Sequence, residues 1–143
     1  MDDAAIDAGR YADQFDNGIE YGGWIIKRGN CWAYGFMAGT DTGLDPETLE
    51  LLRPDGARIL WHTHPEVGDG AYDTWREENF SGNPNDWQSG DLWTAEWHDI
   101  RIYLHTPSGN NKVYEPRERE KGHLKAFARD LENKEPERCS CFE

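Results

Sequence analysis

The sequence predicts one α/β domain with a central mixed β-sheet and flanking helices. Short apolar or alternating runs, typical of strands, lie between segments whose apolar residues recur at helical spacing. Clusters of Gly, Asn and Asp separate these segments and indicate turns. The 143 residues correspond to about one domain, and seven Trp, six Tyr and five Phe can fill its core. We therefore place a single domain at residues 1–133 and a loose tail at residues 134–143.

The N-terminal part is expected to form a helix followed by a β-hairpin. Residues 3–15 are expected to be helical because five apolar residues share one face: Ala4, Ala8, Tyr11, Ala12 and Phe15. Residues 20–27 and 31–37 have strand character, and the second run alternates aromatic with smaller residues. The turn residues 28–30 between them indicate that the two strands pair.

A second helix and a buried strand are expected next. Asp45 precedes Pro46, an arrangement typical of a helix start, and residues 54–56 form a turn that ends the helix. Residues 57–63 form a short apolar strand. Residues 65–86 form a long loop of a kind that is usually functional or mobile. Three aromatic residues in or next to this loop are expected to serve loop packing rather than to form a substrate platform: Trp75, Phe80 and Trp87.

The C-terminal part is expected to contain two more helices and two more strands. A helix is predicted at 89–98, and strands at 100–105 and 112–115 flank a turn. Pro116 opens a final helix. Four apolar residues at helical spacing support this last prediction: Leu124, Phe127, Ala128 and Leu131.

Composition excludes several classes of function. There are 28 acidic and 15 basic residues, so the formal net charge is −13, and this argues against nucleic acid or anionic membranes as partners. No apolar run approaches the roughly 18 residues of a transmembrane helix, and MDDAAIDAGR lacks the apolar stretch of a signal peptide. Three Cys are too few for a disulfide scaffold. Cys31 is expected to be buried in its strand, and Cys139-Ser140-Cys141 is not a CxxC motif.

The chemically informative run is Trp61-His62-Thr63-His64-Pro65. Strand residues two apart lie roughly 7 Å from each other on one face, so His62 and His64 could both reach one ion. Catalytic zinc uses three protein ligands and keeps a fourth position for water. We expect Asp91 to be the third ligand, although an acid at a helix start is also favoured by the helix dipole alone. The alternative is that both histidines make ordinary hydrogen bonds.

Together with Glu20 on an early strand, these residues resemble the JAMM (MPN+, JAB-type) zinc metalloprotease signature. That signature combines a distant Glu, a His-Ser/Thr-His-Pro run and a Ser-x-x-Asp run, and it implies a JAMM/cytidine-deaminase-like fold. The sequence is closest to an uncharacterised family found at the C-termini of Rhs-type polymorphic toxins. The resemblance runs from about residue 4 to 116, over segments 20–24, 62–64, 87–91 and 103–109.

The resemblance implies a role for each matching residue. His62, His64 and Asp91 would bind Zn²⁺, with water in the fourth position. Glu20 would act as general base and then as general acid. Zinc would lower the pKa of the water and polarise the scissile carbonyl.

The sequence departs from the signature in two places. Gln88 occupies the position of the signature Ser, which helps to hold the oxyanion; a Gln amide can donate a hydrogen bond, and the neighbouring Ser89 is a possible substitute. His64 and Asp91 are 27 positions apart, more than in the signature. The third ligand could therefore instead be one of the loop acids: Asp69, Asp73 or Asp86.

These observations lead to a functional expectation. We expect a zinc-dependent peptidase or isopeptidase that is the toxic tip of a secreted Rhs-type or type VI-associated bacterial effector. The resemblance implies a cognate immunity protein, a larger carrier and a protein or peptide substrate, with delivery into a target cell. The loop at residues 65–86 is expected to be a mobile lid over the site. The alternatives are a non-proteolytic binding module and a metal-dependent toxin of other chemistry, such as a nuclease.

Overall fold

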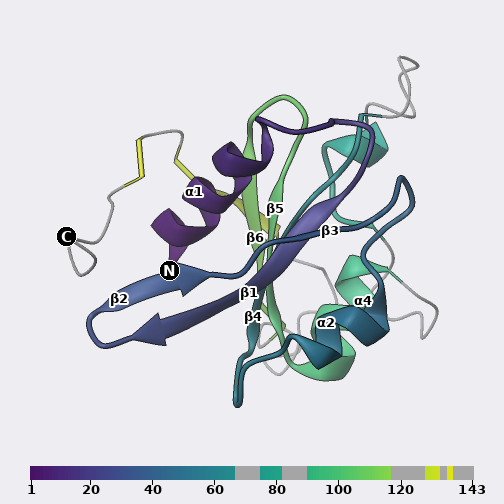
Figure 1. The fold of residues 1–143 in the computed structure, drawn as a ribbon. Coiled ribbons are helices and arrows are strands. Elements are labelled where there is room, and N and C mark those ends of the chain that lie inside the picture. Colours follow the sequence, from purple (N-terminus) through teal and green to yellow (C-terminus); the bar gives the residue numbers. More distant parts are fainter. Residues whose placement is uncertain (67–74, 82–89, 117–127, 133–134, 137–143) are drawn as a thin grey trace.

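The fold is a helix-flanked mixed sheet. It was examined in a computed structural model that describes residues 1–66, 75–81, 90–116, 128–132 and 135–136. The described helices and strands follow one another in this order: α1 (Asp2–Ala12), β1 (Tyr21–Arg28), β2 (Cys31–Tyr34), β3 (Met37–Ala38), α2 (Pro46–Leu51), β4 (Ile59–Thr63), α4 (Asp91–His98), β5 (Arg101–His105), β6 (Asn111–Tyr114) and β7 (Ala128–Asp130). In this part of the chain, seven strands form one sheet in the order β2-β1-β4-β5-β6-β7, with β3 also paired to β1 (Figure 1). The expected α/β class with a central mixed sheet is confirmed.

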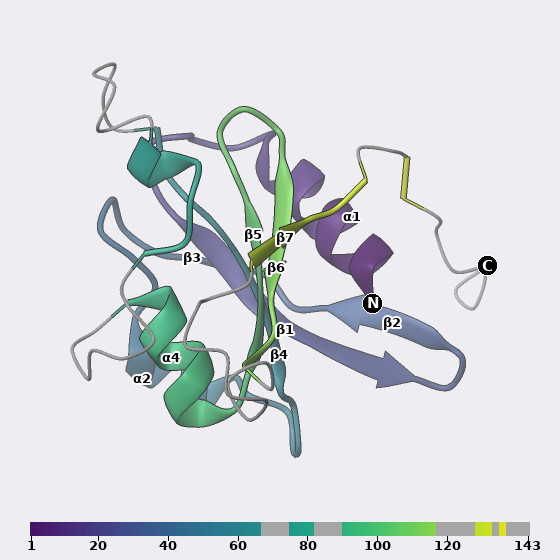
Figure 2. The same cartoon turned by 180° about the vertical axis from the view of Figure 1, so that it is seen from behind.

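The sheet separates two cores. Trp61 of β4 and Tyr103 of β5 pack against α1 on one face. The adjacent Leu60 and Leu104 point to the opposite face, where they pack with Ala95 of α4. This alternation follows from the period of two along a strand. Figures 1 and 2 show α1 on one side of the sheet and the helices α2 and α4 on the other.

The three expected helices that fall on described residues are present. Helix α1 begins one residue before its predicted start and ends three residues before its predicted end. Helix α2 begins at Pro46, and the side chain of Asp45 accepts a hydrogen bond from the Thr48 amide at 3.3 Å, as expected of an N-cap. Helix α4 begins at Asp91, whereas the predicted start at Ser89 lies outside the described residues.

The expected hairpin is present, but its second strand is divided. Strands β2 and β3 pair with opposite halves of β1 in one continuous antiparallel register. Between them the carbonyl of Gly35 accepts a hydrogen bond from the Trp61 indole at 2.9 Å. A Cβ on Gly23 of β1 would lie only 2.3 Å from the same carbonyl oxygen. The Gly35 carbonyl therefore bonds a core side chain, while the Gly35 amide still donates to the Trp24 carbonyl of β1 at 2.8 Å.

A crossover unit lies at the centre of the sheet. Strand β4 pairs in parallel with β5, and α4 lies between them in the chain. All other described pairings are antiparallel. In open sheets of this kind, ligands bind beyond the carboxyl ends of the parallel strands. His62 and His64 lie at that end of β4.

The predicted final helix is wrong over residues 128–130. These residues form β7, which pairs with β6 in the register Val113↔Arg129. Pairing with an otherwise open edge of β6 satisfies backbone groups that a helix would leave exposed there. Leu131 keeps an apolar role and packs beside the α1 core. The preceding part of the predicted helix, including Leu124 and Phe127, lies outside the described residues.

The described part of the 65–86 loop packs against the body of the protein, and the mobile lid stays a prediction. Residues 75–81 contain a helical turn at 75–77, and the side chains of Glu77 and Phe80 are buried. Phe80 joins the core beneath α4, which confirms its expected packing role. Trp75 is exposed, and Trp87 lies outside the described residues.

Two composition-based expectations can be compared with the structure. Cys31 is buried, as predicted, and it is disulfide-bonded. Within the described ranges, none of the helices has the length and apolar character needed to span a membrane.

Candidate metal centre

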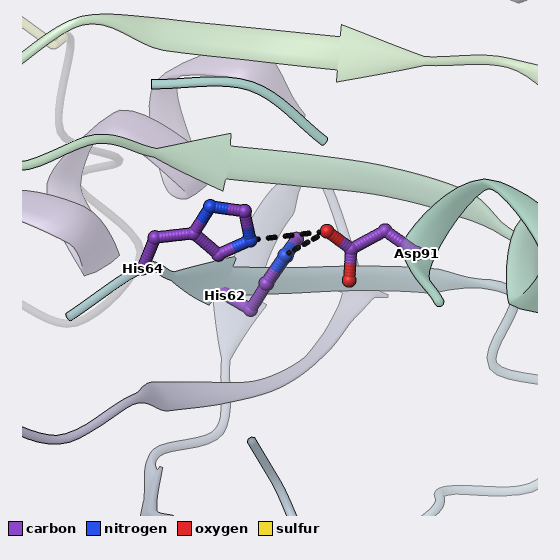
Figure 3. Close-up of side chains that lie close together, drawn as sticks. All are labelled: His62, His64 and Asp91. Atoms are coloured by element: carbon purple, nitrogen blue, oxygen red, sulfur yellow. Dashed lines mark hydrogen bonds and ion pairs between the residues drawn. The ribbon is translucent and has the colours of Figure 1, made fainter. Parts of the chain in front are cut away.

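The two histidines of the central run point to the face of α4. His62 lies on β4 among residues that alternate between the two cores, and His64 lies one residue beyond the strand. Thr63 points the other way and accepts a hydrogen bond from the Tyr21 amide at 2.9 Å. The imidazole rings of His62 and His64 are 5.0 Å apart (Figure 3). The expectation that both face one side is confirmed.

Backbone carbonyls fix the orientation of both rings. Nδ1 of His62 lies 2.8 Å from the carbonyl oxygen of Tyr103 on β5. Nδ1 of His64 lies 3.2 Å from the carbonyls of both Arg76 and Glu77. A carbonyl only accepts hydrogen bonds, so each Nδ1 carries the proton and each Nε2 is available for another partner. Orientation of this kind is typical of histidines that bind metals.

The available nitrogens converge on Asp91. Its Oδ2 lies 3.0 Å from Nε2 of His62 and 3.1 Å from Nε2 of His64 (Figure 3). The three ligand atoms all lie within 4.8 Å of one another. Asp91 is the first residue of α4, and its side chain is 18% exposed. The structure therefore brings together the three residues that the sequence analysis selected as ligands.

The charges in this group are strongly coupled. Burial lowers the pKa of His62, but the carboxylates of Asp91 and Glu20 outweigh this effect and raise the pKa to about 9. Burial alone would raise the pKa of Asp91, but the two histidines hold it well below its usual range. Without a metal, protonation of the histidines therefore stabilises the ionised carboxylate of Asp91.

The donor set fits a divalent cation. Nε2 of His62 is buried and faces Oδ2 of Asp91 at 3.0 Å. Both Nε2 atoms present lone pairs to a carboxylate oxygen when the rings are neutral, so a positive charge is needed between them. A single metal ion, bound by both imidazoles and the carboxylate, would supply this positive charge. The His62, His64 and Asp91 group could therefore hold a metal ion.

Glu20 lies beside this group without belonging to it. Gly22 of β1 pairs with His62, so Glu20, two residues earlier, falls on the same face and toward His64. Its backbone is fixed by hydrogen bonds with Thr40 and Gly39. Burial raises the pKa of its carboxyl group, which also interacts electrostatically with His62, Asp91 and His64. A carboxylate with a raised pKa next to a metal group can accept and return a proton.

Some of the predicted site residues cannot be compared with the structure. Gln88 and Ser89 lie outside the described residues, as do the alternative ligands Asp69, Asp73 and Asp86. The sequence analysis missed Ser81, whose backbone amide donates a hydrogen bond to Oδ2 of Asp91 at 2.9 Å. No local sequence pattern marks this contact, because the two residues are ten positions apart and joined through a backbone group.

A scan against protein-family models and searches of curated proteins and of solved structures found no match.

Proposed function

We propose that this chain is a zinc-dependent hydrolase of the JAMM type, acting as a peptidase or isopeptidase. The observation that carries the proposal is the buried group of His62, His64 and Asp91, in which Nε2 of both histidines lies within 3.0–3.1 Å of one carboxylate oxygen. Two histidines and one carboxylate are a ligand set that catalytic zinc uses. The raised pKa of the neighbouring Glu20 supports a hydrolytic role over simple metal storage.

Each residue has a defined task in this proposal. His62, His64 and Asp91 would hold the ion. Zinc supplies Lewis acidity, which lowers the pKa of water and polarises a carbonyl group. Glu20 accepts the proton of the attacking water at its carboxylate and delivers it to the leaving amine. The carbonyls of Tyr103, Arg76 and Glu77 keep both imidazoles in the tautomer that leaves Nε2 free.

The biological setting is proposed from the sequence resemblance. Residues 4–116 resemble domains at the C-termini of Rhs-type toxins. We propose that the chain is the toxic domain of a larger secreted bacterial protein and acts on a protein or peptide in the target cell. The producing cell would then need a cognate immunity protein that blocks this domain.

The decisive experiment compares Glu20→Gln with His62→Ala. Each variant is expressed in a bacterium that lacks the immunity gene, and toxicity and zinc content are measured. Glu20→Gln keeps all three ligands, so it should retain zinc but lose the base, which typically costs about 10²–10⁴ in rate. His62→Ala should lose both zinc and toxicity.

Two matched variants act as controls. Glu66→Gln changes an exposed acid two residues after His64, and His98→Ala removes an exposed histidine at the end of α4. Both should remain toxic and bind zinc. If Glu20→Gln is as toxic as the wild type while His62→Ala is harmless, Glu20 is not the base. If both remain toxic, the peptidase proposal is wrong and a binding function takes its place.

A further inference from the structure

The segment at residues 75–81 contacts two of the three metal-binding side chains. It lies far from both in the sequence: His64 is 12 residues before Arg76, and Asp91 is ten residues after Ser81. Its contacts are made mainly by backbone atoms. Their arrangement indicates that the segment supports the metal centre.

Ser81 holds the start of α4 through three hydrogen bonds. Its amide donates to Oδ2 of Asp91 at 2.9 Å, and its hydroxyl accepts from the Asp91 amide at 3.0 Å. Its carbonyl accepts from the Leu92 amide, also at 3.0 Å. The first amides of a helix have no partners within the helix, and Gly90, the N-cap of α4, has no side chain to cap them. Ser81 therefore caps the start of α4 from a position ten residues earlier in the chain, and its amide also holds the Asp91 carboxylate by a hydrogen bond.

The same segment fixes His64 from the other side. The carbonyls of Arg76 and Glu77 both lie 3.2 Å from its Nδ1. With Nδ1 occupied in this way, Nε2 is directed toward Asp91. One short stretch of chain thus sets the direction of a histidine ligand and of a carboxylate ligand.

The segment is itself anchored to the body of the protein. Phe80 is buried in the core beneath α4. Glu78 accepts hydrogen bonds from the amide and hydroxyl of Ser108, and Asn79 accepts one from Lys112 of β6 at 3.3 Å. These contacts hold the segment against the β5–β6 turn and β6. A support held at several points can keep the ligands oriented before a metal arrives.

We propose that Ser81 is a positioning residue of the metal centre, presetting the Asp91 carboxylate and the first turn of α4 for metal binding. Ser81 holds Asp91, and the carbonyls of Arg76 and Glu77 hold His64, so the 75–81 segment orients two ligands from outside the metal centre. This inference rests on the proposed zinc site but not on the peptidase reaction. Loss of such an outer contact typically weakens metal binding by about 10–100-fold.

The test measures Zn²⁺ affinity by competition with a chelator in three variants. Ser81→Ala removes the hydroxyl that accepts from the Asp91 amide and should bind zinc about tenfold more weakly, the lower end of that range, because the Ser81 amide remains. Ser81→Thr keeps a hydroxyl and should restore affinity. Thr94→Ala is the control, because Thr94 also bonds the start of α4, through the Gly90 carbonyl, without touching a ligand.

A spectroscopic readout separates positioning from general stability. The visible spectrum of the Co²⁺-loaded protein reports ligand geometry, and it should shift in Ser81→Ala but not in Thr94→Ala. If Ser81→Ala binds zinc as tightly as the wild type and its Co²⁺ spectrum is unchanged, the positioning role of Ser81 is wrong, and the proposed zinc site is unaffected. Failure of the wild-type protein to bind zinc would overturn the proposed function together with this inference.

Discussion

The two faces of the sheet each carry a histidine paired with an aspartate, but one aspartate faces a single imidazole and the other faces two. On the α1 face, Nδ1 of His105 lies 2.8 Å from the side-chain oxygen of Asn111, and Nε2 lies 3.0 Å from both oxygens of Asp13. On the α4 face, Nε2 of His62 and Nε2 of His64 both lie against the same oxygen of Asp91, at 3.0 and 3.1 Å.

The two aspartates also differ in their surroundings. The side chain of Asp13 is 58% exposed, whereas that of Asp91 is 18% exposed and faces two histidines. An exposed carboxylate keeps part of its hydration. The less exposed carboxylate of Asp91, between two imidazoles, is stabilised by positive charge, which protons on the histidines or a metal ion can supply. Both histidines are buried, so burial alone does not identify a metal ligand; the convergence of two imidazoles on one carboxylate does.

The largest expected effect comes from replacing each histidine by alanine. His62→Ala should lose stoichiometric zinc, because two protein ligands rarely hold a catalytic ion. His105→Ala should keep zinc and instead lose stability by about 1–3 kcal/mol, because Asn111 is left without its buried partner. Elemental analysis and urea unfolding measure the two effects. Loss of zinc in His105→Ala would contradict the claim that only the histidines on the α4 face support metal binding.

The pH dependence of zinc binding tests the role of His62 separately from that of His105. In the metal-free protein the pKa of His62 is raised from 6.5 to about 9. Its contribution to stability is therefore complete below pH 6.5 and is lost as the pH rises through about 9. Zinc must displace this proton, so affinity should rise about tenfold per pH unit between about pH 7 and 9.

Calorimetry across this range, in buffers of different ionisation enthalpy, counts the protons released. His105→Ala should give the same slope as the wild type. A zinc affinity that does not change between about pH 7 and 9 would mean that His62 is not displaced from its protonated form.

The smallest expected effect comes from glycines beneath the two histidines. A Cβ on Gly9 would lie 2.4 Å from Cγ of His105. Gly9→Ala should gain about 1 kcal/mol from helix propensity but lose about 1–3 kcal/mol through overpacking. We expect a net loss of stability with unchanged zinc affinity.

Gly22 is the counterpart on the metal face. A Cβ there would lie 2.7 Å from the Trp61 carbonyl and 3.3 Å from Cβ of His62. Gly22→Ala should therefore weaken zinc binding as well as stability. Urea unfolding and chelator competition on both variants test the pair, and equal losses of zinc affinity would contradict the separation of the two faces.

The sequence allowed prediction of those parts of the site that depend on local periodicity. His62 and His64 share a face because strand residues alternate, and the apolar run around them indicated a strand. Asp91 could be named as a candidate from its place at a helix start, whereas Glu20 could be selected only through the family resemblance. The proximity of both to the histidines depends on the crossover through α4 and on the β1–β4 register. Ser81 escaped prediction because its contacts with Asp91 join residues ten positions apart and include backbone atoms, which are chemically alike at every position.

The fold errors have a related cause. Residues 128–131 fit a helical pattern locally, but 128–130 pair with the edge of β6, and tertiary pairing overrides local spacing. The division of the predicted 31–37 strand depends on the distant Trp61 indole, which bonds the Gly35 carbonyl. Such partners become visible only when the strands are assembled.

The most direct test of the central claim is a crystal grown with zinc and measured at the zinc absorption edge. We expect one anomalous peak bonded to Nε2 of His62, Nε2 of His64 and a carboxylate oxygen of Asp91, with Zn–N distances of about 2.0–2.1 Å. Absence of a peak at these three residues, or a peak held by other side chains, would contradict it.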